Sequence, residues 1–323
     1  MKLKVTALRA EAEHVVSVEL RDPNGGELPA FAPGAHLELT LPADEPGTPP
    51  HIRHYSLCNS SLEKSRYVIA VGLSSSSRGG SRFFHEHVRL GSILNSQLPK
   101  NNFPLDHYAN HYRFIAGGIG ITPILSMIKW CLENKKSWSL LYCARSQASA
   151  AYFEELRTLG PNVSFHMDDS AAGSFADLKA ALANPLGGEH VYCCGPRSLM
   201  LGVEEASAHW PENSVHFEWF SAKEIAPPPQ SENASGEFDV VIKSSGARLR
   251  VSSDKSILET LEDHGLAISY SCRQGVCGAC ETGLCDGIAD HRDQLLTPEQ
   301  KASQKTILLC VSRAKSSSLV LDL

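Results

Sequence analysis

The chain has 323 residues, of which 42% are hydrophobic and 20% are charged, and its formal net charge is −6. This composition is typical of a globular protein long enough for two or three domains. No apolar run reaches the roughly 18 to 20 residues of a membrane span, and no cluster of Lys and Arg offers a surface for nucleic acid. The N-terminal sequence MKLKVTALRA lacks the apolar core of a secretory signal. We therefore expect a reducing, cytoplasmic location, which disfavours disulfides.

Residues 1–105 contain short, regularly spaced strand patterns separated by turn residues, which predicts a β-barrel or a β-sandwich. The expected strands are Leu3–Leu8, Val15–Leu20, His36–Leu41, His54–Leu57 and Tyr67–Val71. Two polar motifs accompany them, Arg53-His54-Tyr55-Ser56 and Arg78-Gly79-Gly80-Ser81, and the second motif precedes an expected helix at Arg82–Val88. Taken alone, the first motif is an ordinary strand, and the second is a flexible loop with a helix N-cap.

Residues 106–225 alternate short apolar runs with helical patterns, which predicts a parallel sheet with helices on both faces. The expected strands are Tyr112–Gly117, Ser139–Ala144, Val163–Met167, His190–Cys194 and Val215–Phe220. The expected helices are Pro123–Asn134, Ala151–Leu159, Phe175–Ala183 and Arg197–His209.

Two turns at the ends of these strands are candidates for binding a dinucleotide. The first is Gly117-Gly118-Ile119-Gly120-Ile121-Thr122-Pro123, where we expect Thr122 to cap a helix whose N-terminus faces the phosphates. The second is Cys193-Cys194-Gly195-Pro196, at the edge of the sheet where open α/β folds bind ligands. A glycine turn alone is weak support, and Arg145 stands where an acidic residue often holds the ribose.

A Pro-rich and then polar stretch at 226–236 predicts a linker to a C-terminal domain at 237–323. Four cysteines of that domain, Cys272, Cys277, Cys280 and Cys310, follow the C-x₄-C-x₂-C…C spacing of plant-type [2Fe–2S] ferredoxins. Thiolates are the soft ligands that such clusters need. Gly275 and Gly278 allow the chain to wrap closely around a cluster.

A structural zinc site is the main alternative for these four cysteines, although zinc sites usually have two short C-x₂₋₄-C pairs. Other cysteines are expected to be ordinary buried thiols, which behave as small hydrophobic residues. They are Cys58, Cys131, Cys143, Cys193 and Cys285.

Taken together, the motifs resemble the phthalate dioxygenase reductase family, which includes vanillate O-demethylase reductases, within the ferredoxin–NADP reductase superfamily. The resemblance covers essentially the whole chain. One departure is Asn59, which stands where the R-x-Y-S-x-x-S motif has a small hydroxyl residue. The resemblance implies a multidomain fold with an antiparallel β-barrel for FMN, an α/β domain for NADH and a β-grasp ferredoxin domain.

The resemblance also implies a role for each motif. Arg53 would neutralise the FMN phosphate together with Gly79, Gly80 and Ser81. Ser56 would hydrogen-bond near flavin N5, while Thr122 and Cys194 would flank the nicotinamide, and these three are the expected catalytic residues. Further FMN contacts are expected from His54, Tyr55, Ala70, Val71 and Phe220. Further NADH contacts are expected from Gly117, Gly118, Gly120, Arg145, Gly195 and Pro196.

These three sites would form an electron path, because NADH gives two electrons at once, a [2Fe–2S] cluster accepts one, and a flavin can convert between the two. The resemblance therefore implies a monomeric reductase that passes electrons from NADH to a separate Rieske-type terminal oxygenase. A reductase for another acceptor and a redox-sensing module that does not turn over stay open as alternatives. The donor also stays open, because Arg145 and Ser146 could bind the 2′-phosphate of NADPH.

Overall fold

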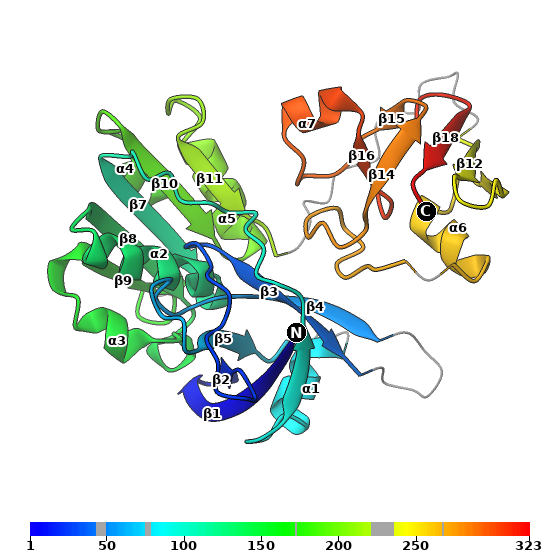
Figure 1. Ribbon diagram of the computed structural model, residues 1–323. Helices are drawn as coiled ribbons and strands as arrows, with labels where there is room; N and C mark the ends of the chain where they lie inside the picture. The colour runs from blue at the N-terminus through cyan, green and yellow to red at the C-terminus, as the bar shows by residue number, and fades with distance from the viewer. Residues whose placement is uncertain (43–49, 75–78, 172, 221–235, 267) are drawn as a thin grey trace. The chain divides into compact units, whose positions relative to one another are not determined.

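The structure is a computed structural model that describes residues 1–42, 50–74, 79–171, 173–220, 236–266 and 268–323 (Figure 1). The chain divides into two compact units, Met1–Trp219 and Phe220–Leu323. The predicted linker at 226–236 lies outside the described residues except for Gly236. No helix among the described segments combines the length and the apolar character needed to cross a membrane.

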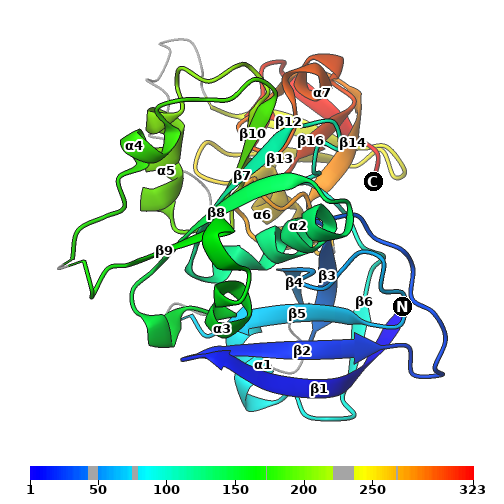
Figure 2. The same ribbon diagram turned by 90° about the vertical axis from the view of Figure 1, so that its left-hand side faces the viewer.

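The first unit begins with a six-stranded antiparallel sheet in the order β4-β3-β6-β1-β2-β5. Its elements are β1 (Lys2–Ala12), β2 (Val15–Arg21), β3 (His36–Leu41), β4 (His51–Ser56), β5 (Tyr67–Gly72), α1 (Gly80–Glu86) and β6 (Ile93–Ser96). Leu3 and Val5 of β1 are buried while Lys2 and Lys4 are exposed, because successive strand residues face opposite sides of the sheet. Figure 2 shows β1, β2 and β5 side by side.

The same unit continues with a five-stranded parallel sheet in the order β11-β10-β7-β8-β9. Its strands are β7 (His111–Gly117), β8 (Ser137–Ala144), β9 (Val163–Met167), β10 (Glu189–Cys194) and β11 (Val215–Glu218). Its α-helices are α2 (Ile121–Glu133), α3 (Phe153–Arg157), α4 (Leu178–Leu182) and α5 (Arg197–Ala206). Phe114 and Ile115 of β7 are both fully buried but in different cores, because α2 and α3 cover one face of the sheet and α4 and α5 cover the other. The predicted α/β arrangement is confirmed.

The second unit contains a mixed sheet in the order β13-β12-β18-β14-β16 and a small sheet of β15 and β17. Its strands are β12 (Phe238–Ile242), β13 (Arg248–Val251), β14 (Glu281–Asp286), β15 (Ala289–Asp290), β16 (Thr306–Leu308), β17 (Arg313–Ala314) and β18 (Ser318–Leu321). Its helices are α6 (Ile257–Asp263) and α7 (Pro298–Ser303). Ser256 and Thr297 begin these helices with capping boxes, which satisfy free N–H groups at each helix start.

Several predicted boundaries are wrong. Strand β6 was not expected, and β11 ends at Glu218, so Phe220 lies two residues beyond the strand rather than at its end. Helix α2 begins at Ile121 after a 3₁₀ turn at Gly118–Gly120, so Thr122 is not its N-cap. Cys285 on β14 is exposed rather than buried, because its side chain lies on the outer face of that strand.

Candidate functional site

The structure brings together the two polar motifs of the N-terminal part at Arg53 on β4 and Gly80 at the start of α1. A Cβ atom on Gly80 would lie 2.7 Å from both Cγ and Nε of Arg53, so only glycine leaves room for this side chain. Gly79 has a φ of +87°, which favours glycine, and the Ser81 hydroxyl accepts a hydrogen bond from the Ser74 N–H at 3.2 Å. Arg78 lies outside the described residues. The pairing of an arginine with a glycine turn fits a phosphate group.

The other residues of the first motif divide between the two faces of β4. The Tyr55 ring meets Phe84 edge to face at 4.9 Å between ring centroids, and burial raises the pKa of Tyr55. His54 faces the opposite side, where its Nε2 lies 3.3 Å from Glu38 Oε2. The predicted FMN contact of His54 would therefore come from its backbone. Ala70 and Val71 are buried on β5, and Val71 O lies 3.0 Å from the His85 ring.

The two nucleotide turns interlock at the C-terminal edge of the parallel sheet. A Cβ atom on Gly120 would lie 2.3 Å from the Cys194 carbonyl oxygen, and one on Gly195 would lie 2.9 Å from the Gly117 backbone. A Cβ atom on Gly117 would lie 2.5 Å from Pro196 Cδ. The absence of a side chain at these three positions therefore lets the two turns pack closely against each other. Gly118 differs, because its φ is +52° and its Cβ position faces open space.

Thr122 is buried in the first turn of α2, where its hydroxyl donates to the Ile119 carbonyl at 2.9 Å. Gly120 occupies the N-cap position instead, with no side-chain cap. Arg145 is exposed just beyond β8, and Phe220 is 46% exposed. The structure therefore places the two turns and Thr122 at one edge of the sheet, with Arg145 at the end of the neighbouring strand.

Glu218 is a residue of this site that the sequence analysis missed. It pairs with Cys194 in the register of β10 and β11, and its carboxyl group lies beside the Ser56 side chain of β4, which interacts with it electrostatically. Its Oε2 atom is buried, and none of the described residues forms a hydrogen bond with it. Burial raises the pKa of Glu218 to about 8, against the lowering effect of Ser56, and burial also raises the pKa of Cys194. Glu218 therefore lies beside both Ser56 and Cys194, two of the predicted catalytic residues.

One signal could have revealed Glu218. It is an acidic residue at the carboxyl end of an otherwise apolar parallel strand, the edge where α/β folds bind ligands. The site fits a flavin opposite a dinucleotide. Three features support this fit: the buried Oε2 atom of Glu218, the open position at Gly118 and the space that Gly80 leaves for Arg53.

In the second unit, the four predicted ligand cysteines come together. Thiol contacts link Cys272 with Cys277 and Cys310, and Cys310 with Cys280. The Cys272 N–H donates to Cys277 Sγ at 3.4 Å, and the Gln274 N–H donates to Cys272 Sγ at 3.3 Å. The neighbouring Cys277 and Cys310 thiols, followed by backbone N–H groups, lower the pKa of Cys272.

This set of soft donors fits an iron–sulfur cluster. Among the described residues, no group of three or more His, Cys, Asp and Glu side chains is arranged to hold one metal ion.

The loop that carries three of these cysteines has several special backbone positions. Gly275 and Gly278 have φ angles of +73° and +77°, as the predicted wrap requires. Arg273 also has a positive φ, of +56°, and its side chain is held by Glu262 at 2.7 Å and by the Tyr270 ring at 4.0 Å. The ion pair between Arg273 and Glu262 therefore anchors the loop to α6.

Comparison with known proteins agrees with this geometry. Residues 240–315 match the 2Fe-2S iron–sulfur cluster binding domain, and residues 92–213 match the N-terminal domain of the dimethylamine monooxygenase subunit DmmA-like family. Phthalate dioxygenase reductase of Burkholderia cepacia is 40% identical, and the alignment covers 100% of this chain and 97% of that protein.

Two solved structures are also similar. Phthalate dioxygenase reductase, described as a modular structure for electron transfer from pyridine nucleotides to [2Fe–2S], has a TM-score of 0.71 at 39% identity, covering 100% of this chain and 98% of that chain. An intact type IV self-sufficient cytochrome P450 monooxygenase has a TM-score of 0.87 at 35% identity. That match covers 100% of this chain, which spans 41% of the longer protein.

The chain therefore belongs to the phthalate dioxygenase reductase family. It is an oxidoreductase that transfers electrons from a pyridine nucleotide to a [2Fe–2S] centre, as do the reductase components of oxygenase systems. The predicted reductase class and the predicted cofactors, a flavin, a nicotinamide nucleotide and a [2Fe–2S] cluster, are thereby confirmed.

Proposed function

We propose that this protein is the cytoplasmic, monomeric reductase of a two-component Rieske-type oxygenase, which takes electrons from NADH through FMN to the [2Fe–2S] centre. The observation that carries this proposal is the meeting of Ser56, Glu218 and Cys194, because it joins the flavin side and the nicotinamide side of the first unit. The similarity to phthalate dioxygenase reductase supports the proposed partner.

The proposed FMN site lies on the antiparallel sheet. Arg53 binds the FMN phosphate together with the backbone of Gly79, Gly80 and Ser81, the turn against which its side chain packs. Tyr55 lies along the flavin ring. The remaining contacts are the backbone of His54, Ala70 and Val71, and the Phe220 ring. When bound, FMN accepts two electrons from the nicotinamide and passes them on singly.

The proposed NADH site lies at the edge of the parallel sheet. Gly118 and the start of α2 face the pyrophosphate, while Gly117, Gly120, Gly195 and Pro196 hold the two turns together. Arg145 contacts the adenosine end. Thr122 and Cys194 flank the nicotinamide and exclude water from it.

Ser56 and Glu218 control hydrogen bonding where the two sites meet. While Glu218 is protonated, its carboxyl donates to Ser56 Oγ, which leaves the serine hydroxyl free to donate toward flavin N5. When Glu218 is ionised, the Ser56 hydroxyl donates to the carboxylate instead.

The proposed domain boundaries are 1–105 for FMN, 106–225 for NADH, 226–236 for the linker and 237–323 for the ferredoxin domain. We propose that the N-terminal sheet closes as a barrel, which the bridge between Leu57 and Ile69 supports. We also propose a β-grasp fold for the ferredoxin domain.

A haem monooxygenase is a second candidate acceptor. The self-sufficient P450 that resembles this chain contains a further 59% of sequence that this chain does not span, since the match covers 41% of it. That similarity favours an acceptor of the P450 class as the alternative.

Purified protein should be mixed with NADH and either a Rieske oxygenase or a P450, and electron arrival should be followed in each acceptor's spectrum. Reduction of the Rieske centre at a higher kcat/KM than the haem supports the proposal. Faster reduction of the haem favours the second candidate. Failure to reduce cytochrome c with NADH would contradict both.

A further inference from the structure

Helix α2 carries a stripe of polar side chains that its position against the sheet does not explain. Thr122, Ser126, Lys129 and Glu133 follow one another at intervals of four, three and four residues, which places them on one face of the helix. Seven other residues of this helix are buried, most of them aliphatic. Thr122 belongs to the proposed nicotinamide site, whereas the other three lie further along the same face. We call Ser126, Lys129 and Glu133 the α2 stripe.

Ser126 is fully buried and bonds to the N-terminal sheet region. Its hydroxyl accepts from the Gly34 N–H at 3.0 Å and donates to the Pro123 carbonyl at 2.9 Å. Gly34 has a φ of +87°, and a Cβ atom there would lie 2.0 Å from the Phe103 carbonyl oxygen. This contact fixes the first turns of α2, and with them Thr122, against the antiparallel sheet.

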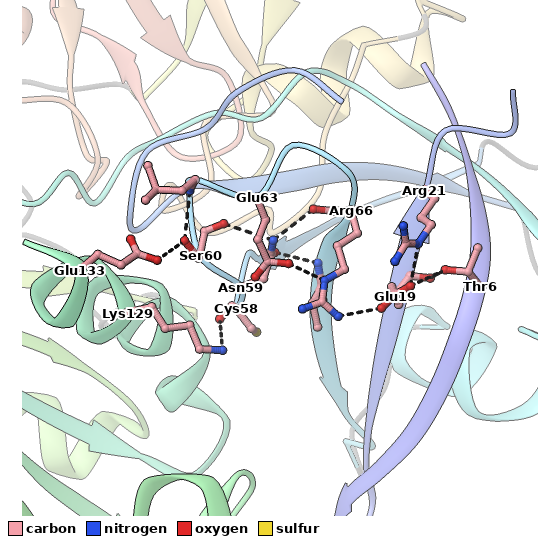
Figure 3. Close-up of polar contacts among 12 residues, drawn as sticks. Thr6, Glu19, Arg21, Cys58, Asn59, Ser60, Glu63, Arg66, Lys129 and Glu133 are labelled. Carbon is pink, nitrogen blue, oxygen red and sulfur yellow. Dashed lines mark hydrogen bonds and ion pairs between the residues drawn. The ribbon is translucent and has the colours of Figure 1, made fainter. Parts of the chain in front are cut away.

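Lys129 and Glu133 hold the segment that follows Ser56. Lys129 Nζ donates to the Cys58 carbonyl at 3.1 Å, and the Ser60 hydroxyl donates to Glu133 Oε1 in a short hydrogen bond (Figure 3). Lys129 also pairs with Glu155 at 3.2 Å. Helix α2 is therefore bonded to the chain two and four residues after Ser56.

Asn59 anchors the same segment on its other side. Its side-chain oxygen accepts from the Val68 N–H at 2.9 Å, and its side-chain nitrogen donates to the Arg66 carbonyl at 3.1 Å (Figure 3). Asn59 is 2% exposed, so these bonds lie in the interior. Segment 58–60 is thus held between strand β5 and helix α2, and the residue that departs from the family motif makes part of this connection.

We propose that the α2 stripe is a positioning device that sets Ser56 on the flavin side in register with Thr122 on the nicotinamide side. Lys129 is its key positioning residue, because its bond to the Cys58 carbonyl is the contact of the stripe that lies nearest to Ser56 along the chain. This inference rests on the proposed function. Hydride transfer needs reacting atoms held about 3 to 3.5 Å apart, and a misplacement of about 1 Å can cost on the order of a hundredfold in rate.

The test uses the FMN-loaded, full-length protein with the substitution Lys129→Met, which keeps the aliphatic stem and removes the charge and the donor. Stopped-flow mixing with NADH gives the limiting rate of flavin reduction, the NADH Kd and the long-wavelength absorbance of the stacked flavin and nicotinamide. The matched control is Lys179→Met, because Lys179 pairs with Glu205 at 3.6 Å between α4 and α5, on the other face of the sheet.

We expect Lys129→Met to slow the limiting rate about tenfold and to weaken the long-wavelength absorbance, with flavin content and NADH Kd within about twofold of the wild type. Lys129→Arg should restore most of the rate, and Ser60→Ala should slow it in the same direction. Lys179→Met should change neither measure.

An unchanged rate per bound flavin in both Lys129→Met and Ser60→Ala would overturn the inference, even if either variant lost flavin or stability. A wild-type protein whose flavin is not reduced by NADH would overturn the proposed function instead, so the two failures are distinguishable.

Discussion

Replacing Glu218 with Gln should remove a pH dependence from flavin reduction. Glu218 has a pKa raised to about 8 by burial, so it is mostly protonated at pH 7 and mostly ionised at pH 9. Only the protonated carboxyl can donate to Ser56 Oγ and free the serine hydroxyl. The share of this form falls about tenfold between pH 7 and pH 9. The limiting rate of flavin reduction should fall by a similar factor.

The Gln side chain carries a permanent donor and does not titrate, so Glu218→Gln should keep most of the rate at pH 7 and lose the decrease toward pH 9. Glu218→Ala should likewise show no decrease toward pH 9, because no carboxylate remains to accept the Ser56 hydroxyl in place of flavin N5. The assay is stopped-flow reduction of bound flavin by saturating NADH from pH 6 to pH 9.5. A wild-type profile that is flat across pH 8, or one that Glu218→Gln leaves unchanged, would refute this reasoning.

The raised pKa of Glu218 should also make the free energy of unfolding depend on pH. The pKa of Glu218 is higher in the folded protein, at about 8, than its ordinary value of 4.5, so between these pH values the folded state binds more protons than the unfolded state. The wild type should therefore lose stability relative to Glu218→Gln as pH rises through this window, by at most about 1.4 kcal/mol per pH unit, and the difference should level off above pH 8.

Three further predictions concern cofactor binding. The protein should contain FMN and about two irons per chain, and chromatography of the released flavin with metal analysis would contradict this by finding FAD or zinc. NADH should give a higher kcat/KM than NADPH, because Arg145 is the one basic residue in the segment 145–150 that follows β8; a preference for NADPH would show that Arg145 and Ser146 suffice. Gly80→Val should displace Arg53, since even a Cβ atom there would lie 2.7 Å from it, and should lower flavin content severalfold. The control is Gly187→Ala, whose Cβ position is open and whose φ is not positive; normal flavin content in Gly80→Val would count against the phosphate site.

The sequence was informative wherever chemistry or periodicity acts over a short stretch. The five strands and four helices of the α/β part were predicted with boundaries mostly within a few residues, because parallel strands buried on both faces are apolar runs. Strand β6 was missed because its four residues, two apolar and then two polar, lack the alternation typical of a strand, and only its pairing with β1 and β3 makes it one.

Contacts between distant segments could not be predicted in this way. Glu218 meets Ser56 only because β11 and β4 approach each other in the folded unit. The sequence also did not show that Gly117, Gly120 and Gly195, which were expected to contact NADH, lie where the two turns pack against each other. The start of α2 was misplaced because Thr122 followed by Pro123 imitates an N-cap, whereas the 3₁₀ turn before Ile121 begins the helix earlier.

The most direct test of the electron path is Cys310→Ser in the full-length protein. The first unit has its own cores and should stay folded, so NADH should still bleach the flavin at close to the wild-type rate. Reduction of cytochrome c and of the partner oxygenase should fall steeply, while ferricyanide, which can take electrons from flavin directly, should still be reduced. Full cytochrome c activity with an intact cluster would show that Cys310 is not the fourth ligand, and loss of flavin bleaching would contradict an independent C-terminal electron exit.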